Sequence, residues 1–104
     1  MTRLRLHLLG PGALLHDGAA VHLHSAKTLA LLAFLALEHD RAHARGALAG
    51  MLWGDAPEAS ARQSLRQALH SLRTTAGGAL QRCIEAGQEG VRIVDVGALR
   101  IDVR

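Results

Sequence analysis

The chain has 104 residues, of which 49% are hydrophobic and 20% are charged. This length and composition fit one globular domain and exclude an intrinsically disordered chain. Aromatic residues make up only 2%, which excludes base stacking on aromatic side chains as the main way of binding a single strand. The formal net charge of +3 is compatible with a polyanionic partner.

The positive charge is not spread evenly along the chain. Residues 1–57 contain five Lys or Arg and four Asp or Glu, and residues 77–104 contain four of each. The surplus therefore falls between them, where three arginines accompany only one acidic residue, Glu58.

The cysteine count and the hydropathy pattern indicate in which cellular compartment the protein is expected. The single cysteine, Cys83, excludes an internal disulfide and fits a reducing cytoplasm. At the N-terminus, Arg3 and Arg5 alternate with leucines and do not precede the apolar block of a signal peptide. The longest near-apolar run, Leu29–Leu37, is far shorter than the ~20 residues of a membrane span. We expect a cytoplasmic protein without a membrane partner.

The chain begins with strand patterns. Residues Arg3–Leu9 alternate strictly between leucine and polar residues, which predicts a half-buried strand. A break at Gly10–Gly12 precedes a short strand, Ala13–His16, and the turn signal Asp17-Gly18 leads into another, Ala20–His24. These segments predict a small antiparallel sheet at the N-terminus.

Helix signals follow. Ser25 is a good N-cap for a helix over Ala26–Glu38, which has apolar residues on almost all sides and should be central and buried. The segment ARGALAGMLW, residues 44–53, predicts a second, shorter helix that ends near Trp53, a core residue. Pro57 is well placed to begin a third.

The third helix, about residues 58–76, has two distinct faces when its residues are placed at ~100° intervals. The apolar arc contains Ala61, Leu65, Ala68, Leu69 and Leu72. The opposite arc contains Arg62, Gln63, Arg66, Gln67, His70 and Arg73. We therefore expect this helix to pack by one face and to present the other.

A hairpin should follow. Gly77-Gly78 ends the helix, and residues 80–96, with the turn Gly87–Gly90 between two segments LQRCIEA and VRIVDV, predict a β-hairpin. A last strand pattern occupies residues 99–104. Strands, three helices and then a hairpin define an α+β winged helix-turn-helix, with the hairpin as its wing.

Two stretches also resemble a known family. LRLHLLGPGALLHDGAAVHLHSAKTLALLAFLAL and LAGMLWGDAPEASARQSLRQALHSLR resemble the DNA-binding domain of SARP-type (Streptomyces antibiotic regulatory protein) transcriptional activators over essentially the whole chain. The resemblance implies an OmpR-like winged helix that binds promoter DNA, commonly as tandem copies on direct repeats. It also implies contacts with RNA polymerase, in part from the turn between the second and third helices, where Asp55 and Glu58 are the candidates.

The sequence departs from the family in two places. The family's hairpin usually has a tyrosine after its glycine, whereas here the run is Gly90-Val91-Arg92-Ile93. Family members normally continue into a helical-repeat activation domain, and we expect residues 1–104 to form a single DNA-binding domain without one.

The polar face of the third helix offers suitable chemistry for duplex DNA. Arginine can bridge O6 and N7 of guanine, and glutamine can bridge N6 and N7 of adenine. Base contacts concentrate in the first half of such a helix, which favours Arg62, Gln63, Arg66 and Gln67 as base readers. His70 and Arg73 lie further along and are candidates for phosphate contacts.

Further phosphate candidates lie outside that face. Ser64 flanks it, Arg45 begins the second helix beside free backbone N–H groups, and Lys27 lies in the first turn of the first helix. Arg92 is the candidate for a wing contact. Each of these also fits an ordinary surface role.

Functions other than DNA binding find less support in the sequence. His22, His24, His39 and His43 could in principle hold zinc or copper, but no cysteine or carboxylate completes a recognised spacing, so no metal or cofactor is expected. The sequence lacks the motifs of nucleophilic hydrolases and P-loop enzymes, so an enzyme is not expected. The serious alternative is a winged-helix module that binds another protein and not DNA.

Overall fold

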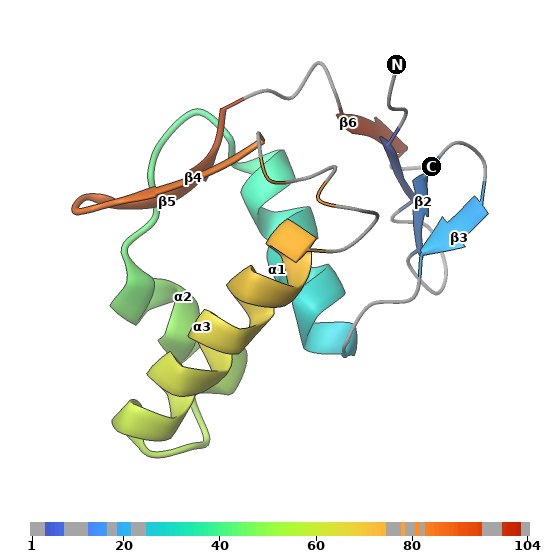
Figure 1. Ribbon diagram of the computed structural model, residues 1–104. Coiled ribbons are helices and arrows are strands. Elements are labelled where there is room, and N and C mark those ends of the chain that lie inside the picture. The colour runs from blue at the N-terminus through green and yellow to red at the C-terminus, as the bar shows by residue number, and fades with distance from the viewer. Residues whose placement is uncertain are drawn as a thin grey trace.

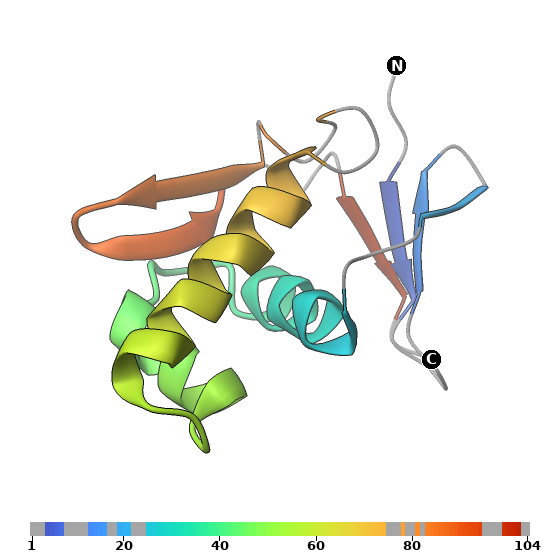
Figure 2. The same cartoon turned by 60° about the horizontal axis from the view of Figure 1, so that its bottom comes forward.

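The computed structural model describes residues 4–7, 13–16, 19–21, 25–74, 78, 81, 83–94 and 99–102. Within these ranges the chain forms strands and helices in the order β1, β2, β3, α1, α2, α3, β4, β5, β6. In both views the helices lie between a four-stranded sheet on one side and a β-hairpin on the other (Figures 1 and 2). This is the predicted α+β winged helix.

The N-terminal sheet has the strand order β3-β2-β1-β6. Strands β1 (Leu4–His7), β2 (Ala13–His16) and β3 (Ala19–Val21) are antiparallel, as predicted, and residues 3, 8–9 and 22–24 of the predicted strands lie outside the described residues. Strand β6 (Leu99–Asp102) adds to the free edge of β1 in parallel. The predicted break at residues 10–12 and the turn at residues 17 and 18 lie outside the described residues.

Helix α1 spans Ala26–Leu37 and is capped as predicted, because the Ser25 hydroxyl accepts a hydrogen bond from the Thr28 backbone N–H at 3.2 Å. Thr28 itself is fully buried. The helix is central, but it is not buried on all sides, since Lys27 is exposed and Leu37 is 54% exposed. Apolar content therefore overestimated how much of this helix its neighbours cover.

Helices α2 (Arg45–Trp53) and α3 (Glu58–Thr74) pack against each other across a short turn. The Ala56 N–H donates to the Trp53 carbonyl at 3.1 Å within that turn, and the Pro57 carbonyl accepts the first bond of α3, from Ala61, at 2.9 Å. The acidic residue in the first turn of α3 and the arginine in its last turn both complement the helix dipole.

The hairpin, called the wing below, consists of β4 (Ile84–Gly87) and β5 (Gly90–Ile93). It is shorter than the predicted 80–96, and its last paired residues are Gly87 and Gly90. The Val94 N–H donates to the Cys83 carbonyl at 2.8 Å and so extends the pairing by one bond. The predicted helix stop at residue 77 lies outside the described residues, while Gly78 has a φ of 85°.

One core joins these elements. Its largest fully buried side chains come from β2, α1, α2, α3 and β5, and Cys83 is also buried there. Trp53 packs against the core and is half-buried, which agrees in part with its predicted core role. Among the residues that the structure describes, no helix is long and apolar enough to cross a membrane.

Candidate nucleic-acid interface

Helix α3 divides into the two predicted faces. All five residues of the apolar arc are buried: Ala61, Leu65, Ala68, Leu69 and Leu72. In the opposite arc, Arg73 is half-buried and the others are exposed: Arg62, Gln63, Arg66, Gln67 and His70. The helix is therefore held by one side only, and its Arg/Gln/His side faces solvent.

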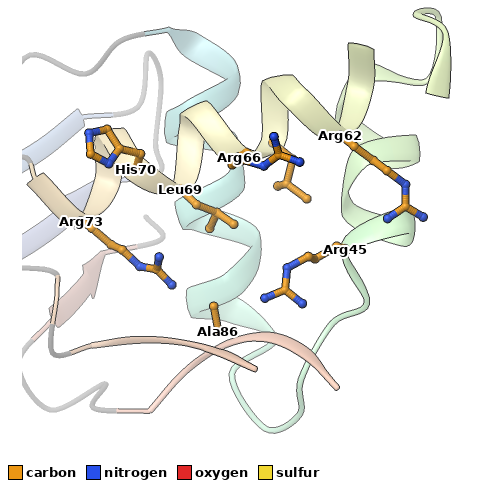
Figure 3. Close-up of a pocket in the computed structure, with 8 residues that line it drawn as sticks. Arg45, Arg62, Arg66, Leu69, His70, Arg73 and Ala86 are labelled. Carbon is orange, nitrogen blue, oxygen red and sulfur yellow. The ribbon is translucent and has the colours of Figure 1, made fainter. Parts of the chain in front are cut away.

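A groove of about 330 Å³ runs between α3 and the wing. Four arginines and a histidine line it, with Leu65, Leu69 and Ala86 as the apolar part of the lining, and no carboxylate lines it among the residues that the structure describes. Figure 3 shows the guanidinium groups of Arg45 and Arg73 between α3 and the wing, with the side chain of Arg62 extending on the α2 side. The cationic residues are Arg45, Arg62, Arg66, Arg73 and, when protonated, His70.

The two arginines in the first half of α3 have only weak partners. The Arg62 guanidinium lies 3.4 Å from the Glu58 carboxylate, but both side chains are largely exposed, at 49% and 83%. An exposed pair of this kind contributes about 0.3–0.5 kcal/mol. Arg66 donates to the side-chain oxygen of Gln63 at 3.0 Å. Both guanidinium groups can therefore exchange these partners for a ligand at small cost.

The Arg45 side chain is held more firmly than those of Arg62 and Arg66. Its guanidinium donates to the Gly87 carbonyl at the end of β4, at 2.6 Å, and so joins the start of α2 to the wing. The side chain is half-buried and still lines the groove. No side chain caps the N-terminus of α2, so its first backbone N–H groups remain available in the same region.

Three other candidates lie on a different flank of α3. Lys27, Ser64 and Gln67 line a separate hollow between α3 and the first turn of α1. The Lys27 ammonium lies 5.9 Å from the centre of the Trp53 ring, within cation–π range. The structure therefore separates the predicted residues into an arginine-rich flank beside the wing and a mixed polar flank beside α1.

On the wing, Arg92 is paired and exposed. Its guanidinium lies 3.5 Å from the Glu85 carboxylate, its cross-strand partner in the hairpin register. Glu89, in the turn of the wing, is exposed as well. Between α2 and α3, Asp55 and Glu58 are both exposed, and Glu58 also pairs with Arg62.

Sequence reasoning missed the residues that shape the groove. A Cβ added to Gly46, in the first turn of α2, would lie 3.0 Å from an Arg62 guanidinium nitrogen, so this glycine leaves room for that side chain. The backbone carbonyl of Gly87 is the anchor of Arg45. Neither role has a signal in side-chain chemistry, because both depend on which segments the fold brings together.

Two of the four candidate metal-ligating histidines, His39 and His43, lie within the described residues. His43 is 6% exposed, and its Nε2 atom lies 2.8 Å from the Glu38 carbonyl oxygen, while His39 is exposed. His22 and His24 lie outside the described residues. Across the part of the chain that the structure describes, no group of three or more potential ligands is arranged to hold a metal ion.

Comparison with known proteins identifies a similar structure. No family model matches the sequence, and the search of curated proteins gives no match. The fold is similar to that of Mycobacterium tuberculosis EmbR, solved in complex with a low-affinity phosphopeptide, with a TM-score of 0.78 and 30% sequence identity. The similarity covers 95% of this chain but 27% of the EmbR chain.

EmbR is a SARP-family regulator. Because the chain spans about a quarter of EmbR's length, the likeness concerns one domain and says nothing of where EmbR holds its phosphopeptide. The three helices and the hairpin match EmbR's winged-helix domain, in agreement with the resemblance noted in the sequence. The chain is a SARP-like winged-helix domain.

Proposed function

We propose that this domain binds double-stranded DNA sequence-specifically and serves transcriptional regulation, with α3 in the major groove and the wing against the neighbouring backbone or minor groove. The observation that carries the proposal is the free face of α3. It combines exposed arginines and glutamines with an arginine-lined groove that has no carboxylate in the described part of its lining. Such a surface attracts phosphates and can hydrogen-bond base edges.

The dimensions of α3 suit this role. The major groove is about 12 Å wide and admits one α-helix, whose diameter with side chains is about 10–12 Å. Arg62 and Arg73 are separated by about 16 Å along the axis at 1.5 Å per residue. Arg62 and Arg66 would thus read bases near the start of the helix, with Gln63 and Gln67 beside them. His70 and Arg73 would reach phosphates.

The flanks of α3 supply the remaining contacts. Arg45 and the free N–H groups of α2 lie on the wing side of the groove, where one DNA strand would pass. Lys27 and Ser64 lie on the α1 side, where the opposite strand would pass. Backbone contacts on both sides would fix the register of the helix, while base edges provide specificity.

The finer regulatory assignments also belong to this proposal. Tandem binding to direct repeats in a promoter and contact with RNA polymerase follow from the SARP resemblance. The exposed carboxylates of Asp55 and Glu58 lie in the α2–α3 turn and at the first residue of α3, and are available to a protein partner there. We propose a cytoplasmic, non-enzymatic regulator domain.

The proposal is tested by selecting bound sequences from random duplexes at two salt concentrations. A recurring motif, together with an affinity that falls as salt rises, is the expected result. Recovery of random sequences with negligible affinity at low salt would reject DNA binding and favour the alternative, a winged-helix module for protein interaction.

A further inference from the structure

The wing is attached to the helices through one buried histidine. The backbone of His43 pairs with Val91 of β5 through two hydrogen bonds, of 2.8 and 2.9 Å. The His43 ring packs edge-on against Phe34 of α1, with centroids 4.8 Å apart, and its Nε2 atom lies 2.8 Å from the Glu38 carbonyl. Because a carbonyl can only accept, Nε2 carries the proton.

His43 therefore connects α1 to the wing, through its side chain on the α1 side and through its backbone on the wing side. The side chain is fixed to the C-terminal end of α1, where helix carbonyls lack intrahelical partners. The main chain is fixed to the wing. His43 as a whole is 6% exposed and Val91 is fully buried, so the connection is shielded from water. The His43 side chain thus helps to set the distance from α1 to β5, together with the direct packing of β5 on α1 in the core.

The wing has a matching feature at Gly90. Its φ of 136° is rarely adopted by residues with a side chain. A Cβ at this position would also overlap the His43 carbonyl oxygen. Gly90 therefore permits the close approach of the wing to His43. A Cβ at Gly87, its partner in the hairpin, would meet open space.

A second hydrogen-bonded connection to the wing lies two residues further along the chain, at Arg45. Arg45 donates to the Gly87 carbonyl at 2.6 Å, so residues 43 and 45 hold β5 and β4 respectively. The two bonds come from the end of the α1–α2 connection and from the first residue of α2, and the groove beside α3 is lined by Arg45 and by Ala86 of the wing. Any shift of the wing relative to this connection would change the width of the groove.

We infer that His43 is a positioning residue for DNA binding: through Phe34 and Glu38 it fixes the wing, and with it Arg92, at the separation from α3 that lets both contact one duplex. This inference rests on the proposed function. It assigns to His43 an effect on how the wing engages DNA, without any contact between His43 and the duplex.

The test is a double-mutant cycle on the affinity for a selected duplex. In the wild-type background, Arg92→Ala should weaken binding about 5-fold, and in the His43→Ala background its effect should fall below about 2-fold. Arg66→Ala, on α3, should cost the same factor in both backgrounds. A merely structural loss of folded protein would leave both factors unchanged. Thermal unfolding and circular dichroism establish that each variant is folded at the assay temperature.

Two further variants complete the design. His43→Gln keeps an N–H donor that can reach the Glu38 carbonyl and should restore most of the Arg92 effect. Should His43→Ala not fold, Gly90→Ala takes its place, with Gly87→Ala as the matched control that leaves the Arg92 effect intact.

Each outcome has one meaning. An Arg92→Ala effect of equal size with and without the His43 side chain, or no effect in the wild type, would overturn the inference while DNA binding stands. If the wild-type domain shows no salt-dependent affinity for any duplex, the proposed function itself fails.

Discussion

Replacing Arg66 by alanine should weaken binding to the preferred DNA site and relax base preference at one position. Arg66 is exposed on α3, lines the arginine groove and donates only to Gln63. Its removal breaks one exposed hydrogen bond, from the charged guanidinium to an amide oxygen, and leaves no buried group without a partner. Alanine is also the best helix former, so the free energy of unfolding should change by less than about 0.5 kcal/mol. A change in DNA affinity would then report on the interface alone.

The size of the effect follows from the contact that is lost. A bidentate arginine–guanine pair is worth about 1–3 kcal/mol of discrimination, which corresponds to about 5- to 150-fold in affinity. Arg66→Lys keeps the charge but cannot form two parallel hydrogen bonds to O6 and N7. The lysine variant should therefore keep the salt dependence of the wild type and lose most of the base preference.

The assay is fluorescence anisotropy with the selected duplex and with a set carrying each alternative base pair in turn. The alanine variant should lose the discrimination at one base pair and keep it at the others. If Arg66→Ala binds every duplex in the set as the wild type does, while remaining folded, the assignment of this face of α3 to base recognition is wrong.

Three other substitutions test separate parts of the account. Arg73→Ala should weaken binding to all sequences alike and reduce the slope of log affinity against log salt by about 0.9 for the one lost phosphate contact; an unchanged slope would remove Arg73 from the interface. Glu58→Gln removes the carboxylate 3.4 Å from Arg62 and should raise the affinity for non-specific duplex about 2-fold, because repulsion from phosphates falls; weaker binding would mean that Glu58 mainly orients Arg62. Gly90→Ala should lower the unfolding free energy by about 1–3 kcal/mol because of its φ and its overlap with the His43 carbonyl, and Gly87→Ala should stay within about 0.5 kcal/mol; equal melting temperatures for the two variants would contradict the described packing.

The helices and the two faces of α3 could be predicted because the information is local. The N-cap at Ser25 and the helical spacing of leucines in α3 are encoded by residues near one another in sequence. The same holds for the wing, whose strands are adjacent along the chain. Its pairing begins at Ile84 and ends at Ile93, inside the predicted range of residues 80–96.

The missed features depend on contacts between distant segments. The parallel pairing of β6 with β1 joins the two ends of the chain, and alternation shows which residues share a face without naming the neighbouring strand. The bond from Arg45 to Gly87 spans 42 positions. His43 was considered only as a metal ligand, since nothing in its local sequence indicates a backbone bridge to Val91. The candidate DNA residues of α3 were predicted as a set, but their division between two flanks required the fold.

The most direct measurement is the affinity of the domain for its selected duplex after 7-deazaguanine replaces the guanine at the base pair where Arg66→Ala is expected to lose discrimination. This substitution deletes one major-groove acceptor and leaves the minor groove and the phosphates intact. We predict that the wild type binds the modified duplex at least about 5-fold more weakly, whereas Arg66→Ala binds both duplexes equally. The contrary result is a wild-type affinity that stays the same when 7-deazaguanine replaces each guanine of the site in turn and 7-deazaadenine replaces each adenine. That result would contradict insertion of α3 into the major groove.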